Sequence, residues 1–71
     1  MHKNIIKINK KGEEYLIFSK EGMLLSLDKQ EYEIFDKYGA YNKISEIDLA
    51  YKEFLIKLVS YGILEFEDFS N

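Results

Sequence analysis

The residues that could carry reactive chemistry are few, and their spacing does not match a metal or nucleophile site. The only histidine, His2, stands next to the chain start, and the sequence contains no cysteine. Protein zinc sites draw their ligands mainly from cysteine and histidine. We therefore expect this chain to bind neither a metal nor another cofactor.

The acidic side chains are the remaining candidates for catalysis, as paired carboxylates. Glu13 and Glu14 fall in a predicted turn, while Glu31, Glu33 and Asp36 fall on the polar face of a predicted helix. These positions are typical of solvated surface rather than of a buried acid and base pair. The chain also lacks a phosphate loop, a nucleophile elbow and a dinucleotide fingerprint. The sequence thus predicts that the protein is not an enzyme.

Length and composition set the outer limits of what the chain can be. Seventy-one residues, 46% apolar and 32% charged, predict one globular domain over residues 1–71, with a core spanning about residues 4–67. The first residues do not resemble a signal peptide and no apolar run reaches membrane-spanning length, so we expect a cytoplasmic protein without a membrane partner. A net charge of −3 and the absence of arginine argue against a nucleic-acid partner.

Three short apolar segments are predicted to form strands. They are Asn4–Ile8, Tyr15–Phe18 and Met23–Leu27, and they are separated by the turn sequences Asn9–Gly12 and Lys20–Gly22. Turns this short join antiparallel neighbours. The sequence therefore predicts a three-stranded antiparallel meander with its third strand at an edge.

The helices that follow give the chain an α+β fold. Asp28 and Glu31 have the spacing of a capping box, which predicts a helix from about Lys29 to Tyr38. Gly39 is expected to end this helix. Ser45, with Asp48 three residues later, is expected to cap the helix that follows it, and Ile44–Asp48 is expected to form a separate short helical turn before the last helix.

The last predicted helix runs from about Asp48 to Tyr61 and ends at Gly62. Its predicted core stripe contains Ala50, Tyr51, Phe54, Leu58 and Tyr61. Further apolar positions widen this stripe on one side, with Lys52 interrupting them: Leu49, Leu55, Ile56 and Val59. The combined arc is wider than one packing partner requires, which indicates surplus apolar surface.

The third strand and the last helix together suggest a peptide-binding groove. Met23–Leu27 is apolar on both faces except at Ser26, and it carries neither lysine nor proline, the residues that commonly protect sheet edges. An extended peptide could pair with this edge and rest its side chains on the helix. The candidate binding residues are Met23, Leu24, Leu25, Ser26, Leu27, Lys52, Leu55, Ile56 and Val59. The pattern alone leaves a second possibility open, that a homodimer partner or the C-terminal tail covers this surface.

Two segments resemble a known family. They are Gly22-Met23-Leu24-Leu25-Ser26-Leu27-Asp28 and the exit Leu58-Val59-Ser60-Tyr61-Gly62-Ile63-Leu64-Glu65. Over about residues 13–67 the chain resembles the PqqD-like proteins, the RiPP recognition elements of ribosomally made, post-translationally modified peptide pathways. The resemblance implies a small winged-helix-like domain of three strands and three helices. Only residues 42–47 are available here for the second helix.

The same resemblance implies a function. PqqD-like proteins act as peptide chaperones, which bind the leader of a precursor peptide as an added strand between the third strand and third helix. They are not enzymes themselves and present the peptide to a modifying enzyme, such as a radical SAM protein, a cyclodehydratase or a leader peptidase. The matching elements here are Met23–Leu27 and Asp48–Tyr61.

Two other classes of function remain as alternatives. A winged-helix DNA-binding regulator would place a helix in the major groove, but the last helix offers only Lys52 and Lys57 against Asp48 and Glu53. Without arginine, bidentate recognition of guanine cannot occur. The third class is an accessory subunit that uses the groove only to form a homodimer.

Overall fold

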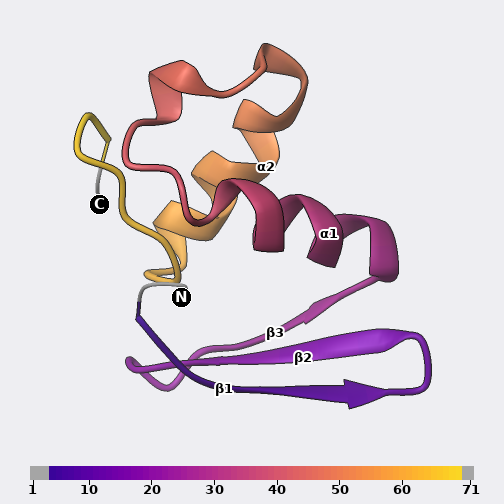
Figure 1. The fold of residues 1–71 in the computed structure, drawn as a ribbon. Coiled ribbons are helices and arrows are strands. Elements are labelled where there is room, and N and C mark those ends of the chain that lie inside the picture. The colour runs from indigo at the N-terminus through magenta and orange to yellow at the C-terminus, as the bar shows by residue number, and fades with distance from the viewer. Residues whose placement is uncertain (1–3, 70–71) are drawn as a thin grey trace.

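The chain folds into one antiparallel sheet followed by two helices. The computed structural model describes residues 4–69. Its strands are β1 (Ile5–Lys11), β2 (Glu14–Ser19) and β3 (Leu24–Leu27), and they lie in the order β1-β2-β3. Figure 1 shows the sheet with both helices on the same side of it. The predicted meander and α+β class are therefore confirmed.

The first turn differs from the prediction. We expected it at residues 9–12, but β1 continues to Lys11, which pairs with Glu14, so the loop consists only of Gly12 and Glu13. Gly12 has a φ of 64°, which fits a two-residue hairpin with glycine at its first loop position. The polar end of β1 can stay extended because its backbone pairs with β2 while its side chains reach solvent.

The second turn lies at Lys20–Gly22, as predicted. Gly22 has a φ of 88° and donates its N–H to the Ser19 carbonyl at 3.2 Å, while the Ser19 N–H donates to the Met23 carbonyl at 2.9 Å. This is a three-residue hairpin loop with a bulge at glycine. The bulge places Met23 just before β3, so the strand begins one residue later than expected.

Helix α1 (Lys29–Tyr38) has the predicted bounds. The Asp28 carboxylate accepts the Glu31 N–H at 2.8 Å, and the Glu31 carboxylate accepts the Asp28 N–H at 3.0 Å, so the capping box is present. Gly39 is the C-cap residue, as predicted, but it keeps a right-handed φ of −64° and donates its N–H to the Phe35 carbonyl in a regular helical hydrogen bond. The start of this helix is thus fixed by local sequence.

The connector between the helices contains one short 3₁₀ helix, η1 (Ile44–Glu46). Its N-cap position is Lys43, which makes no side-chain capping bond, and Ser45 lies inside η1, so the prediction that Ser45 caps the helix after it is wrong. Instead the Asp68 carboxylate accepts the N–H groups of Ile44 and Ser45, at 2.8 and 3.1 Å. A residue from the far end of the chain therefore caps this helix.

Helix α2 (Leu49–Ser60) begins and ends close to the prediction. The Asp48 side chain accepts the Ala50 N–H at 2.9 Å. At the other end, Gly62 adopts a φ of 78°, and Ile63 donates its N–H back to the Leu58 carbonyl at 3.0 Å. This pattern is a Schellman motif, which requires a residue that tolerates positive φ.

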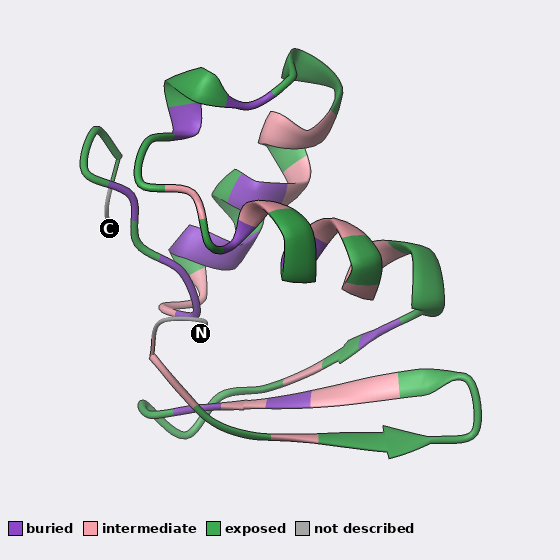
Figure 2. Ribbon diagram, in the orientation of Figure 1, coloured by how far each residue is buried: buried purple, intermediate pink, exposed green. Residues whose placement is uncertain are grey.

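The core lies between the sheet, the two helices and the tail, as the buried segments in Figure 2 show. Its buried apolar residues are Ile17, Leu27, Phe35, Ile44, Ile47, Leu55, Leu58, Val59, Ile63, Leu64 and Phe66. Ala50 is exposed, although the stripe placed it in the core. Within residues 4–69, no helix is long and apolar enough to cross a membrane.

Candidate peptide-binding edge

The outer edge of β3 is open within residues 4–69, because β3 pairs only with β2. Ser19 and Met23 form a hydrogen-bonded pair, and the register continues with Phe18 opposite Leu24 and Ile17 opposite Leu25. Bonded and non-bonded pairs alternate in an antiparallel ladder. The N–H and C=O groups of Leu25 therefore point to β2.

The same alternation directs the backbone of Leu24 and Ser26 outward. Each residue presents one donor and one acceptor along the free edge, with spacing that matches another extended chain. Neither residue is a lysine or a proline, and the strand is straight enough to keep four consecutive pairs with β2. The edge can thus accept a further strand by main-chain hydrogen bonding.

The opposite edge of the sheet is protected. β1 carries Lys7, Lys10 and Lys11, and its pairing with β2 shifts between Ile5 and Lys7, which marks a bulge. Lysines and bulges both discourage the addition of a strand. Of the two edges, β3 is therefore the one suited to a peptide.

The side chains of β3 divide between two environments. Leu27 is buried beneath the helices and Leu25, on the same face, is partly buried against the core. Leu24 and Ser26 point to the other face of the sheet, which the helices leave uncovered, and Leu24 remains 54% exposed. A peptide paired with β3 would therefore place its side chains alternately on the helix-covered face and on the open face of the sheet.

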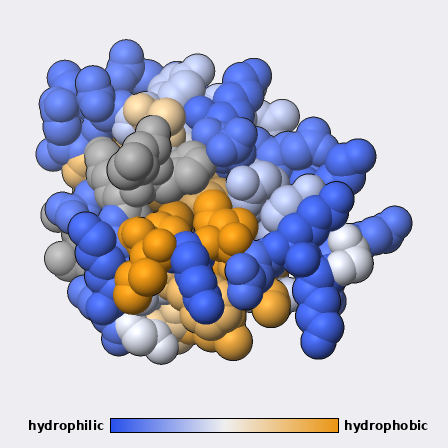
Figure 3. All heavy atoms as spheres, turned by 60° about the horizontal axis from the view of Figure 1, so that its bottom comes forward, coloured by the Kyte–Doolittle hydropathy of each residue, from blue (hydrophilic) through white to orange (hydrophobic). Residues whose placement is uncertain are grey.

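Apolar side chains gather on this open face. Phe18 pairs with Leu24 on one side and Lys7 on the other, and the Lys7 ammonium lies 4.7 Å from the centre of the Phe18 ring. Leu16 follows along the same face, opposite Ser26. Figure 3 looks towards the sheet and shows a hydrophobic patch bordered by hydrophilic side chains.

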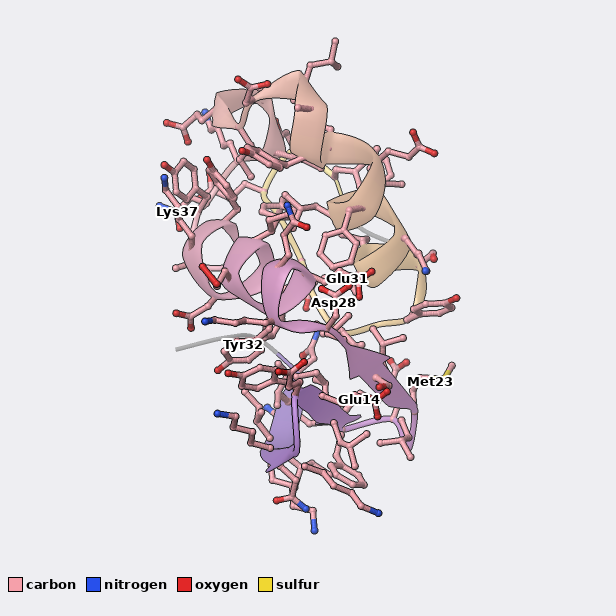
Figure 4. The ribbon with its side chains drawn as sticks, turned by 90° about the vertical axis from the view of Figure 1, so that its right-hand side faces the viewer. Glu14, Met23, Asp28, Glu31, Tyr32 and Lys37 are labelled. Atoms are coloured by element: carbon pink, nitrogen blue, oxygen red, sulfur yellow. The ribbon has the colours of Figure 1, made fainter. Side chains whose placement is uncertain are left out.

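Helix α2 lies on the β3 side of the molecule. Figure 4 looks along the sheet and shows α2 on the same side of the molecule as β3, and Figure 1 agrees, although the helix that packs directly on β2 and β3 is α1. Met23 projects on the β3 side in this view, and Tyr32 projects on the opposite side. The predicted neighbours, the third strand and the last helix, are thus brought to one side.

Two of the predicted helix residues do not form surplus surface. Leu55 and Val59 are 0% and 1% exposed, so the expectation that they belong to a surplus apolar arc is wrong, and both are core residues. The sequence pattern treated α2 as a helix with one packing partner. In the fold, α1, the sheet and the buried tail residues Ile63, Leu64 and Phe66 share the core with it.

The other two helix residues remain accessible. Ile56 is 40% exposed and Lys52 is partly buried. Leu49, at the start of α2, is also exposed. The sequence placed it in the apolar arc but not among the candidate binding residues. The usable side-chain contacts on α2 are therefore fewer than the hydrophobic pattern indicated.

A pair of stacked tyrosines lies away from the β3 edge. The rings of Tyr15 and Tyr32 are 3.9 Å apart and nearly parallel, at 4°. Burial raises the pKa of the Tyr32 phenol, and the nearby Asp36 and Tyr15 raise it further. The sequence predicted core packing for Tyr32 but did not identify Tyr15, on β2, as the ring that stacks on it.

Two shallow hollows lined by described residues do not border β3. One, of about 220 Å³, is lined by Lys10, Gly12, Glu13, Tyr15 and Lys29. The other, of about 210 Å³, is lined by Gln30, Glu33, Ile34, Lys37, Tyr38 and Tyr51. Small-molecule sites usually have volumes of about 300–1,000 Å³, so an extended edge is a stronger candidate than either hollow.

The described residues contain no group of three or more His, Cys, Asp or Glu side chains arranged to hold a metal ion. Comparison with known proteins finds no matching family model, no matching curated protein and no matching solved structure.

Proposed function

We propose that this chain is a non-enzymatic adaptor of the PqqD-like type, which binds the leader segment of a ribosomally synthesised precursor peptide. The peptide adds as a strand to β3, on the side of the molecule where α2 lies. The complex then presents the rest of the precursor to a separate modifying enzyme.

The observation that carries this proposal is the pair of outward-facing backbone groups at Leu24 and Ser26 on an unprotected edge. Main-chain pairing supplies register and part of the affinity in strand addition, and side chains supply selectivity. The order of elements supports the proposal further, because three strands, a helix, a short helical turn and a last helix follow the order expected from the resemblance.

The test is chemical-shift mapping of the full chain with the leader of a short precursor peptide encoded beside its gene. We expect the largest amide shifts at Leu24 and Ser26, with smaller shifts at Ile56 on α2. Shifts limited to α1 and the lysines of β1 would contradict the proposed binding mode, even for a tightly bound peptide. A genome that encodes this chain without any neighbouring precursor or modifying enzyme would weaken the leader-peptide role.

A further inference from the structure

The uncovered face of the sheet restricts the peptide sequences that can bind to β3. The helices cover only one face, so the added strand would have side chains on two different surfaces (Figures 1 and 3). Side chains alternate between the faces along a strand, and directly opposite residues lie about 4.5–5.5 Å apart at Cβ. The side chains of β3 therefore define the neighbours of each peptide position.

The position opposite Leu24 lies on the uncovered face. There Leu24 is 54% exposed and adjoins Phe18, which is itself only partly covered by Lys7. A strand added at this edge would place one side chain directly beside Leu24, at the open end of the row formed by Lys7, Phe18 and Leu24. An apolar side chain there would remove both leucine and its own surface from water.

The next position, opposite Leu25, lies on the helix-covered face. Leu25 is partly buried against the core, so a side chain beside it would also meet apolar surface. The position opposite Ser26 returns to the uncovered face, where Ser26 is exposed and its β2 neighbour is Leu16. A polar side chain is suited to that position because it would adjoin the serine hydroxyl and solvent.

We infer that β3 selects an extended peptide that contains two consecutive apolar residues. One of them lies beside Leu24 on the uncovered face, and the other lies beside Leu25 on the covered face. A polar residue adjoins this pair and lies beside Ser26. This inference rests on the proposed strand addition and specifies which side chains the site selects. The order of the three positions depends on whether the peptide runs parallel or antiparallel to β3. The assignment of faces is the same in both orientations.

The test is a selection from a displayed library of random ten-residue peptides on the full chain and on two variants. Leu24→Thr removes the apolar side chain at the uncovered face, where the chain tolerates change because the residue is exposed. Ile6→Thr is the matched control, because it removes an apolar side chain that is 66% exposed on the opposite edge strand. Circular dichroism and thermal melting establish that both variants fold.

We expect the wild type and Ile6→Thr to enrich the same consecutive apolar pair. Leu24→Thr should lose the preference at one member of the pair and keep it at the other. For a peptide chosen by the wild type, fluorescence anisotropy should show about two- to fivefold weaker binding to Leu24→Thr, the size expected for one cross-strand pair.

Two different failures can be told apart. If the wild type enriches peptides but Leu24→Thr enriches the same sequences, the uncovered face does not contribute to peptide selectivity. This inference is then overturned, while strand addition stands. If the wild type enriches no peptide, the proposed function is overturned, and the inference with it.

Discussion

The hydroxyl of Ser19 accepts a hydrogen bond from the Met23 N–H at 2.9 Å, at the point where the chain enters the edge strand. Ser19 is the only buried polar side chain among residues 4–69, at 1% exposed. The bulge at Gly22 leaves the Met23 N–H without a regular ladder partner, and the serine provides one. This contact holds β3 in the register that turns the backbone of Leu24 outward.

Replacing Ser19 with alanine should destabilise the hairpin. The expected loss is about 0.5–1.5 kcal/mol in the free energy of unfolding, the usual net value of one hydrogen bond. Urea denaturation followed by circular dichroism measures this change. Ser26→Ala serves as the control, because that serine is exposed on β3, and a change above about 0.5 kcal/mol there would show that the assay responds to any serine removal.

Proline at position 26 should weaken peptide binding without disrupting the sheet. Its missing N–H is one that points away from β2, and proline is tolerated on an edge strand in that orientation. We expect about two- to tenfold weaker peptide binding, equivalent to a lost hydrogen bond of about 0.5–1.5 kcal/mol. Fluorescence anisotropy with a library-selected peptide provides the measurement.

The matched control for this variant is Leu25→Pro, which removes an N–H directed at β2. It should lower the thermal stability of the whole domain, because a ladder bond inside the hairpin is lost. Equal thermal destabilisation by the two prolines would show that the assigned directions of the β3 amides are wrong.

Substitutions on α2 should separate core residues from accessible ones. Leu55→Ala should cost about 2–5 kcal/mol of stability, since the side chain is fully buried. Ile56→Ala, one residue later on a 40% exposed side chain, should cost much less. Chemical denaturation of both variants measures these two losses in the free energy of unfolding. A stable Leu55→Ala protein with weakened peptide binding would instead support the groove expected from the sequence.

Alanine at position 62 should destabilise the end of α2. The backbone there has a φ of 78°, and an added Cβ would also collide with the Glu21 carboxylate from the turn before β3. The left-handed conformation alone costs about 1–2 kcal/mol for a residue with a side chain. Thermal and urea unfolding should show at least this loss.

The contribution of Glu21 can be isolated with a double variant. Gly12→Ala introduces a similar strain, at a φ of 64°, into open space. In the background of Glu21→Ala, the cost of Gly62→Ala should fall towards that of Gly12→Ala. An unchanged cost would show that the carboxylate moves away freely and contributes nothing.

Asp68 should make stability depend on pH in the acidic range. Hydrogen bonds from the N–H groups of Ile44 and Ser45 lower the pKa of its carboxyl below the ordinary value of 3.8, the Ile44 bond having the largest effect. The stabilisation is therefore fully present above pH 3.8 and is lost as the pH falls through the lowered pKa.

Thermal melts from about pH 2 to 6 test this dependence. The wild type should be more stable than Asp68→Asn at the upper end, and the difference should shrink below pH 3.8. Glu67→Gln removes the neighbouring carboxyl without touching the contact to η1, so it should retain the wild-type profile. A constant difference between wild type and Asp68→Asn across this range would contradict the assigned role of the carboxylate.

Local sequence determined the order and most of the bounds of the elements. The Asp28 and Glu31 capping box starts α1, Asp48 starts α2, and Gly62 ends it, because each of these signals acts through atoms within a few residues. The edge position of β3 also followed from the sequence, since short turns join neighbouring strands.

Tertiary structure decided which apolar residues remained exposed. Helical periodicity ranks positions around α2, but it does not give the number of surfaces that pack against the helix, so Leu55 and Val59 looked like surplus although both are buried. The cap of η1 by Asp68 joins residues far apart in the sequence, and no local pattern could predict it. The directions of the Leu24 and Ser26 amides depend in the same way on the bulge and pairing register, which form only when β2 and β3 come together.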